Sequence, residues 1–281
     1  ESKPHFIRKK GENFTENEML LEKGTHLTPE KISLCAAMGH NDIQVFKPLK
    51  VAIISTGDEL RLPGESLEKG EIYESNTFGL SGLVSWLGHE PVRFPSVVDN
   101  LEQLRETLNS ASKACDVIIT SGGVSMGDRD FVRKIMESEG NIDFWRIKVR
   151  PGSPPLFGTW KETPIFGLPG NPVAVMVTFY QFVQAALKTL QGQITRIPAP
   201  TFKALCTESL KKVPGRTEFQ RGILSKTKDN EWTVKPTGDQ GSGILSSMSQ
   251  AHCFIVLPTD MDKVEAGEFV DVQLIRGLID S

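Results

Sequence analysis

Apolar and polar positions alternate in two ways along the middle of the chain. Residues 51–54 form an unbroken apolar run that predicts a buried strand, whereas Leu80–Leu87 carries apolar residues at the three-to-four spacing of a helix. The same reading predicts further strands at 92–98, 116–119, 144–149 and 164–166, and helices at 101–113, 131–137 and 172–190. Strands that alternate with helices indicate a three-layer α/β domain, in which helices cover both faces of a mainly parallel sheet.

The two ends of the chain follow other patterns. Near the start, polar turns surround a helix signal in which Thr28 suits the N-cap and Pro29 the first helical position. From about residue 197, short apolar runs are separated by Gly, Pro and Asp turns, which predicts a small all-β barrel or sandwich. We therefore expect a remnant of an N-terminal or linker domain at 1–48, the α/β domain at 49–194, and a C-terminal barrel-like domain at 195–281.

Composition narrows the class of protein. Among 281 residues, 38% are hydrophobic and 24% charged, as in soluble globular proteins. The formal net charge of −3 gives no general attraction to nucleic acid or to an anionic membrane. No apolar run approaches the ~20 residues that span a bilayer. The four cysteines are far apart and lack metal-site spacing, which predicts buried, reduced thiols in a cytoplasmic protein.

Three expected strands end in loops with candidate chemistry, and ligands of open parallel sheets bind at such ends. Residues 55–59 join small side chains to two acids, residues 121–130 offer glycines and serines before a helix, and residues 167–172 form a tight turn. Bare backbone N–H groups at a helix N-terminus suit a phosphate. Asp128 and Asp130 then cap the helix, hold Mg²⁺ or orient a water.

Basic residues lie close to these loops in the sequence. Arg146, Lys148 and Arg150 alternate along an expected strand, so they would project to one face just before Pro151. Guanidinium groups at a strand end suit an oxyanion, because they donate paired hydrogen bonds. In the C-terminal domain, Gln220-Arg221-Gly222 and residues 240–243 would by themselves be read as hairpin turns.

Taken together, these motifs resemble the MoeA-type molybdopterin molybdenumtransferases, which include the gephyrin E domain. The resemblance covers roughly residues 6 to 275, with the order and spacing of the family. The matching strings are STGDEL (Ser55–Leu60), SGGVSMGDRDF (Ser121–Phe131), the RPG turn (Arg150–Gly152), GLPGNPV (Gly167–Val173), PGRTEFQRG (Pro214–Gly222) and TGDQGSG (Thr237–Gly243).

The resemblance implies an activity and a set of site residues. The activity is insertion of molybdate into adenylylated molybdopterin with Mg²⁺, which releases AMP and the finished molybdenum cofactor. By position, the catalytic and metal-binding carboxylates are Glu59, Asp99 and Asp130, and the residues that receive molybdate are Arg146, Arg150, Arg221 and Ser242. The residues expected to bind the pterin substrate are Ser121, Gly122, Gly123, Ser125, Thr56, Gly57, Pro169, Gly170 and Asn171.

The chain also departs from the family. Arg146, Arg150 and Ser153 stand where Lys is usual, and Asn100 stands where a second Asp is common. The family's amino-terminal half, with its inserted domain, is missing, and the chain starts at Glu1, so we expect a piece of a longer protein. Family members are homodimers, and a molybdopterin adenylyltransferase would act upstream as a partner.

Two alternative functions stay open. A molybdopterin-binding carrier or scaffold would share the fold without turnover, although binding alone does not need three converging acids. A nucleotide pyrophosphatase of the CinA-like type shares the molybdopterin-binding fold, but the C-terminal QRG and GSG motifs oppose it. A nicotinamide dehydrogenase is poorly supported, because the dinucleotide fingerprint is lacking.

Overall fold

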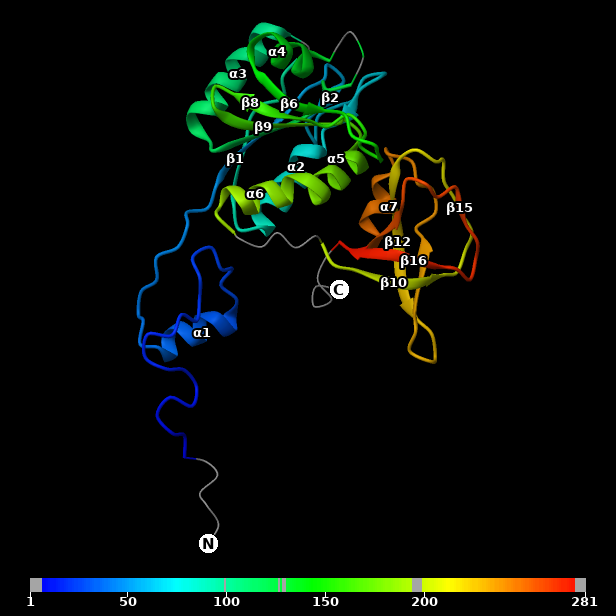
Figure 1. Cartoon of the computed structure of the whole chain (residues 1–281). Helices are drawn as coiled ribbons and strands as arrows, with labels where there is room; N and C mark the ends of the chain where they lie inside the picture. The colour runs from blue at the N-terminus through cyan, green and yellow to red at the C-terminus, as the bar shows by residue number, and fades with distance from the viewer. Residues whose placement is uncertain (1–6, 99, 126, 128–129, 194–198, 276–281) are drawn as a thin grey trace. The chain divides into compact units, whose positions relative to one another are not determined.

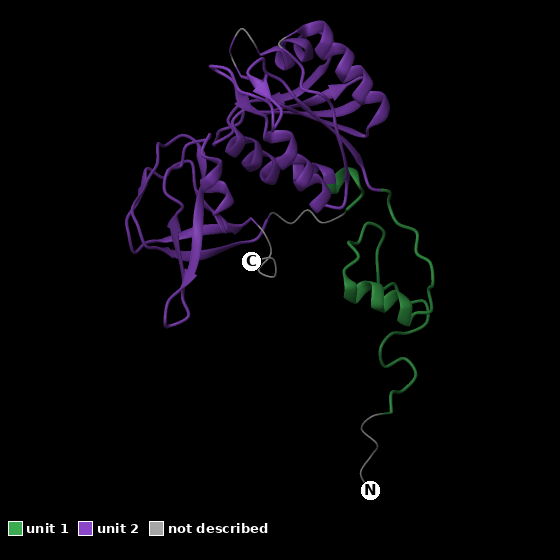
Figure 2. Cartoon of the chain, turned by 180° about the vertical axis from the view of Figure 1, so that it is seen from behind, with its two compact units in different colours: residues 1–47, 188–196 green, residues 48–187, 197–281 purple. Residues whose placement is uncertain are grey.

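The computed structural model describes residues 7–98, 100–125, 127, 130–193 and 199–275, and its contacts divide the chain into two units (Figure 2). The first unit comprises residues 1–47 and 188–196, and its helix α1 (Pro29–Ala37) begins after Thr28 with Pro29 in its first turn, as predicted. The second unit comprises residues 48–187 and 197–281 and contains both the α/β sheet and the barrel. The three expected domain boundaries stay a prediction.

A six-stranded sheet forms the α/β part of the second unit, in the order β4-β1-β5-β9-β8-β6 (Figure 1). The first four strands in this order are parallel, whereas β8 runs antiparallel to both of its neighbours. The strands are β1 (Lys50–Ser55), β4 (Glu90–Arg93), β5 (Val117–Ser121), β6 (Asn141–Trp145), β8 (Leu156–Trp160) and β9 (Thr163–Leu168). The predicted α/β fold class is therefore confirmed.

The two faces of this sheet pack against different helices. Along β1, Val51 and Ile53 face one core and Ala52 and Ile54 face the other, because successive strand side chains alternate. Helices α3 (Leu101–Ala114) and α4 (Phe131–Glu139) complete the core of Ala52, and α2 (Asn76–Trp86) and α5 (Pro172–Thr178) that of Val51. Burial on both faces explains why the β1 sequence is continuously apolar.

The C-terminal part is a closed barrel, as predicted. Its strands follow the order β13-β10-β16-β14-β12, and pairing of β12 with β13 closes the ring. The short strand β7 (Val149–Arg150) of the α/β part adds to β12 in parallel and joins the two parts. The barrel strands are β10 (Thr201–Cys206), β12 (Thr217–Lys226), β13 (Trp232–Pro236), β14 (Cys253–Leu257) and β16 (Phe269–Leu274).

The remaining elements are short. A short helix, α7 (Leu245–Ser249), follows the Thr237–Gly243 motif, and four two-residue strands form two pairs. These pairs are β2 (Leu60–Arg61) with β3 (Ile72–Tyr73) and β11 (Leu210–Lys211) with β15 (Lys263–Val264).

Three sequence predictions need correction. The expected strand at 92–98 is shorter and starts earlier, because β4 spans Glu90–Arg93. The expected strand at 144–149 is interrupted, because Arg146 has a φ of 70° and separates β6 from β7. The expected helix at 172–190 contains a π-helical turn, η1 (Phe179–Val183), between α5 and α6 (Gln184–Leu190). This stretch of 19 residues is long and apolar enough to cross a membrane, but a helix in the core of a soluble protein meets the same criterion.

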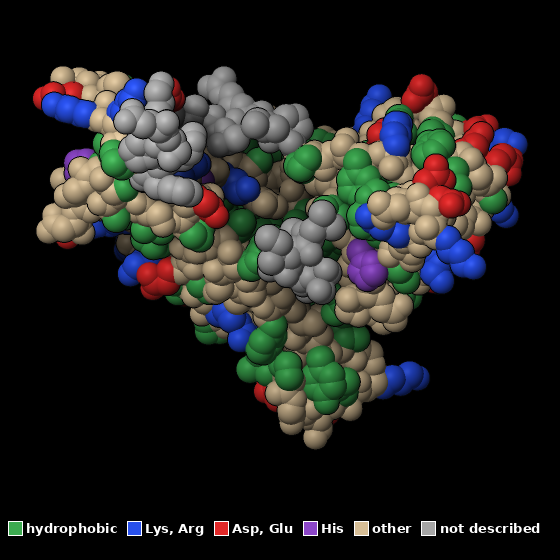
Figure 3. Space-filling view, turned by 90° about the horizontal axis from the view of Figure 1, so that it is seen from below, with side chains coloured by type: hydrophobic (Ala, Val, Ile, Leu, Met, Phe, Trp, Pro, Cys, Tyr) green, Lys and Arg blue, Asp and Glu red, His purple; other side chains and the backbone are tan. Residues whose placement is uncertain are grey.

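The cysteines and the charged side chains agree with the compositional reading. All four cysteines are free and buried, and burial raises the pKa of Cys253 to about 12. On the face shown in Figure 3, lysine and arginine side chains are interspersed with aspartate and glutamate side chains.

Candidate active site

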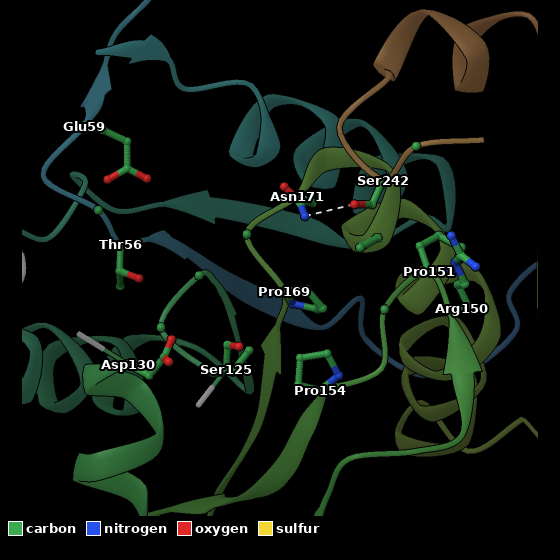
Figure 4. Close-up of a pocket in the computed structure, with 18 of the residues that line it drawn as sticks. Thr56, Glu59, Ser125, Asp130, Arg150, Pro151, Pro154, Pro169, Asn171 and Ser242 are labelled. Carbon is green, nitrogen blue, oxygen red and sulfur yellow. Dashed lines mark hydrogen bonds between the residues drawn. The ribbon is translucent and has the colours of Figure 1, made fainter. Parts of the chain in front are cut away.

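A pocket of about 590 Å³ lies at the carboxyl ends of β1, β5 and β9, beside a turn of the barrel. Figure 4 shows the two carboxylates toward one end of this pocket and Arg150 with Ser242 toward the other. The predicted residues that line it are Thr56, Gly57, Glu59, Gly122, Gly123, Ser125, Asp130, Arg150, Pro169, Gly170, Asn171 and Ser242. The structure therefore brings together residues that lie almost 190 positions apart in sequence.

The loop after β1 places a carboxylate over a glycine. Gly57 has a φ of 150°, and a Cβ atom there would lie 2.7 Å from the Glu59 Oε2 atom. The loop is fixed from two sides, because the Thr56 N–H donates to the Ser121 carbonyl at 3.0 Å and the Gly57 N–H donates to Val97 at 3.2 Å. A side chain at position 57 would displace Glu59 from this side of the pocket.

The loop after β5 is built on two glycines in the left-handed region. Gly122 and Gly123 have φ angles of 99° and 69°, and a Cβ on Gly122 would lie 2.7 Å from the Thr56 carbonyl oxygen. The Gly122 N–H is already used, because it donates to Leu168 at 3.0 Å. Among the described residues, the N–H groups of Gly123, Val124 and Ser125 have no acceptor. These three donors fit the oxygens of a phosphate.

Asp130 stands at the N-cap position of α4 without capping it. Its carboxylate instead accepts a hydrogen bond from the Gly127 N–H and borders the pocket. Predicted Asp99 lies outside the described residues, and no group of three potential metal ligands occurs within the described part of the chain. Asn100 caps α3, because its Oδ1 atom accepts from Glu102 and Gln103 at 2.9 and 3.0 Å. Oxygen ligands from Glu59 and Asp130 nevertheless suit Mg²⁺.

Side chains rather than backbone build the barrel end of the pocket. Arg150 pairs with Glu218 at 3.1 Å, and the Arg150 side chain stays 57% exposed while that of Glu218 is 6% exposed. Asn171 donates from Nδ2 to the Ser242 hydroxyl at 2.9 Å, and the Val173 N–H donates to the Ser242 carbonyl at 3.1 Å. Asn171 is therefore an interdomain link, and it occupies the N-cap position of α5 without a side-chain capping bond.

Two of the four predicted molybdate residues do not line this pocket. Arg146 stacks on Trp145, with its Cζ atom 4.5 Å from the ring centroid, because its positive φ turns the chain. The expectation that Arg146, Lys148 and Arg150 share one strand face is therefore wrong. The molybdate-binding role of Arg146 stays a prediction.

Arg221 is buried beneath the barrel turn. It is 1% exposed, and its guanidinium donates to Ser247 Oγ at 2.8 Å and to the carbonyls of Asp239, Gln240 and Gly241 at 3.0–3.1 Å. Burial lowers the pKa of Arg221 to about 10. In this geometry Arg221 supports the turn that carries Ser242, and its predicted contact with molybdate stays a prediction.

The sequence reading missed several pocket residues. Gly152 has a φ of 100° and lies against α5, where a Cβ would meet Thr178 Oγ1 at 2.5 Å. Gln240 lines the pocket and accepts from the Arg221 N–H through Oε1 at 2.8 Å. The RPG and TGDQGSG motifs were the available signals for both residues. Predicted Ser121 lies behind the lining and is 3% exposed.

Comparison with known proteins identifies the family. Residues 52–189 match the family model described as a probable molybdopterin binding domain, and residues 203–275 match the MoeA C-terminal region (domain IV). A molybdopterin molybdenumtransferase of Haemophilus influenzae is 38% identical over 97% of this chain and 68% of its own length. The chain belongs to the molybdopterin molybdenumtransferase family. The predicted membership of the MoeA type is thus confirmed, and the family is one of transferases in molybdenum cofactor biosynthesis.

Other relatives agree with this membership. The molybdopterin molybdenumtransferase of a Nostoc species is 35% identical over 94% of this chain and 62% of its own length. A solved molybdopterin biosynthesis MoeA protein from Pyrococcus horikosii superposes with a TM-score of 0.79 at 30% identity, covering 96% of this chain and 65% of that one. The chain thus spans about two thirds of the length of these relatives.

Proposed function

We propose that the pocket binds adenylylated molybdopterin and molybdate and that this chain carries the molybdate-insertion site of its enzyme. The observation that carries the proposal is the pocket itself, in which a glycine loop whose N–H groups have no acceptor in the described part of the chain, two carboxylates, an arginine and a barrel hydroxyl converge. The activity that the family resemblance implies cleaves a phosphoanhydride bond and releases AMP while molybdate joins the pterin dithiolene.

The α/β loops would bind the phosphate groups of the substrate. The N–H groups of Gly123, Val124 and Ser125 would donate to phosphate oxygens, and the N-terminal end of α4 adds partial positive charge. Arg150 and Ser242 would bind the dianionic molybdate, because a guanidinium and a hydroxyl both donate hydrogen bonds to an oxyanion. The two anions would then lie in one cavity.

Glu59 and Asp130 would hold Mg²⁺ together with Asp99. When bound, Mg²⁺ would neutralise charge on the phosphoanhydride that is cleaved. Glu59 lies against Gly57, and Asp130 accepts from the Gly127 N–H, and neither carboxylate is in an ion pair with another described residue. This arrangement favours an enzyme over a carrier, because phosphate binding by itself would be opposed by nearby carboxylates.

The test is Asp130→Asn, with AMP release measured by chromatography in the presence of molybdate and Mg²⁺. We expect AMP release to fall by about 100-fold or more, while binding of adenylylated molybdopterin is kept. Glu139→Gln is a matched control, because Glu139 lies on the same helix and pairs with Arg105 away from the pocket. Wild-type AMP release by the Asp130→Asn variant would contradict the catalytic assignment.

The remaining proposals concern assembly. We infer a homodimer that acts in the cytoplasm on the product of a molybdopterin adenylyltransferase. Exposed apolar side chains around β3 and the start of α2 support a protein contact there, since Ile72, Tyr73 and Phe78 are 55%, 48% and 45% exposed. Light scattering of the full-length protein tests the dimer, and a monomeric mass would contradict it.

A further inference from the structure

Asn76, the first residue of α2, lies behind the pocket and connects two of its loops. Its Nδ2 atom donates to the Ser121 hydroxyl at 2.8 Å and to the Gly170 carbonyl at 2.7 Å. Ser121 ends β5, and Gly170 belongs to the turn after β9. One amide group therefore fastens both loops that face the proposed phosphate groups.

The orientation of this amide follows from its partners. The Gly170 carbonyl can only accept a hydrogen bond, so the atom of Asn76 beside it must be the nitrogen. Both Nδ2 protons are then used, and the Ser121 oxygen acts as an acceptor. Among the described residues, no acceptor takes the Ser121 hydroxyl proton.

The two loops also touch through their backbones. A Cβ atom on Gly170 would lie 3.7 Å from the Gly122 Cα atom, and the Gly122 N–H donates to the Leu168 carbonyl at 3.0 Å. Both Gly122 and Gly170 line the pocket. A shift of one loop would therefore move the other and change the positions of the N–H groups that face the pocket.

The Asn76 amide makes these two hydrogen bonds although its own oxygen atom is left without one. Its Oδ1 atom is buried and has no hydrogen-bond partner among the residues that the structure describes. Buried acceptors without a partner are rare in folded proteins, and they concentrate where function constrains the structure. A residue that served stability alone would gain from a partner for this atom.

We infer that Asn76 is a positioning residue for the phosphate groups of the substrate, acting through Ser121 and Gly170. The inference rests on the function proposed above. Through its bonds to the Gly170 carbonyl and the buried Ser121 hydroxyl, Asn76 holds the turn after β9 against the loop after β5, and it thereby keeps both loops in position beside the phosphate groups. Asn76 itself does not touch the substrate.

The test is a double-mutant cycle on binding of adenylylated molybdopterin, measured by calorimetry. We expect Asn76→Ala and Ser121→Ala each to weaken binding by about tenfold. In the double variant the affinity should fall by much less than the product of the two single-variant factors, because Asn76 acts partly through Ser121. The Asn76→Asp variant should bind adenylylated molybdopterin more weakly still. Its carboxylate would accept the Ser121 proton and would face the Gly170 carbonyl without a hydrogen to donate.

A matched control separates positioning from stability. Asn109 accepts one hydrogen bond from Trp160 Nε1 at 3.1 Å, and it lies on α3 away from the pocket lining. Asn109→Ala should lower the melting temperature without changing pterin affinity or KM. Asn76→Ala should raise KM while kcat stays nearly unchanged. Wild-type affinity in both Asn76 variants would overturn the inference.

The proposed function and the positioning role of Asn76 can be tested separately. If the wild-type protein binds no adenylylated molybdopterin, that function is wrong, and amide hydrogen exchange of the ligand-free protein then decides the inference. We expect Asn76→Ala to speed exchange of the Gly122 N–H at least tenfold relative to Asn109→Ala. Equal exchange rates in the two variants would show that Asn76 does not hold the loops.

Discussion

The two ends of the pocket differ in the groups that form them, which are backbone N–H groups at one end and side chains at the other. At the α/β end, Gly122 and Gly123 adopt left-handed φ angles and offer backbone N–H groups. At the barrel end, charged and polar side chains form the pocket: Arg150 pairs with Glu218, and buried Arg221 supports the turn of Ser242. Backbone donors have a fixed position and charge, whereas side-chain donors depend on their supporting contacts. Substitutions should therefore act sterically at the first end and electrostatically at the second.

The largest effect is expected at the α/β end. Gly122→Ala would place a Cβ 2.7 Å from the Thr56 carbonyl at a φ of 99°, so the loop must shift. We expect adenylylated molybdopterin to bind about 100-fold more weakly, which corresponds to strain at the upper end of about 1–3 kcal/mol. Calorimetry measures the affinity.

The matched control for this substitution is Gly82→Ala. Gly82 lies in α2, where an added Cβ meets nothing within 4 Å and the φ is ordinary. This control should keep wild-type affinity. An equal affinity of the two alanine variants would mean that the substrate does not use the glycine loop.

An intermediate effect is expected from Arg221→Met at the barrel end. The substitution leaves three carbonyls and the Ser247 hydroxyl without their donor, so we expect unfolding free energy to fall by about 2 kcal/mol. The molybdate concentration for half-maximal insertion should rise about tenfold, because the turn of Ser242 loosens. Urea unfolding and AMP-release assays measure the two effects.

Arg216→Met is the control for Arg221→Met. Arg216 is an exposed arginine of the same domain, and it lies in the turn before β12. The Arg216→Met variant should change neither quantity. Arg221→Met with wild-type stability would show that the buried guanidinium does not support the turn.

The smallest effect is expected from the charge of Glu218. In Glu218→Gln the side-chain oxygen still accepts from Arg150, but the negative charge next to the proposed molybdate site is gone. We expect half-maximal insertion at a molybdate concentration about threefold lower, since removing one nearby charge that is already paired with Arg150 is worth less than about 1 kcal/mol. Glu218→Ala should have the opposite effect, because Arg150 loses its support.

The control for Glu218 is Asp271→Asn, which neutralises the partner of an exposed barrel ion pair with Lys203. It should leave the molybdate dependence unchanged. If Glu218→Gln weakens molybdate binding as much as Glu218→Ala does, the account of the barrel end is wrong.

Features that depend on local pattern were predictable from the sequence. The apolar run at 51–54 is a strand buried on both faces, and the apolar spacing of Leu80–Leu87 corresponds to a helix that covers the sheet. The loops at the ends of β1, β5 and β9 converge because parallel strands place their carboxyl ends at one edge. The motifs in these loops were sufficient to predict most of the residues that line the pocket.

Features that depend on tertiary contacts were not predictable. A motif cannot show that Arg221 is buried under carbonyl groups, since the same guanidinium would be a ligand if it faced the pocket. Alternation alone made 144–149 a strand, but Arg146 turns the chain and breaks it. Asn76 carries no periodic signal, because its importance lies in partners that are 45 and 94 residues away.

The central claim is that one cavity receives the phosphate groups on the α/β loops and the oxyanion at the barrel end. The most direct measurement is a crystal structure of the full-length protein with adenylylated molybdopterin and tungstate, a heavy analogue of molybdate. The account predicts an anomalous tungsten peak within hydrogen-bond distance of Arg150 and Ser242, and phosphate density on the N–H groups of Gly123–Ser125. Tungsten or phosphate density outside this pocket would contradict it.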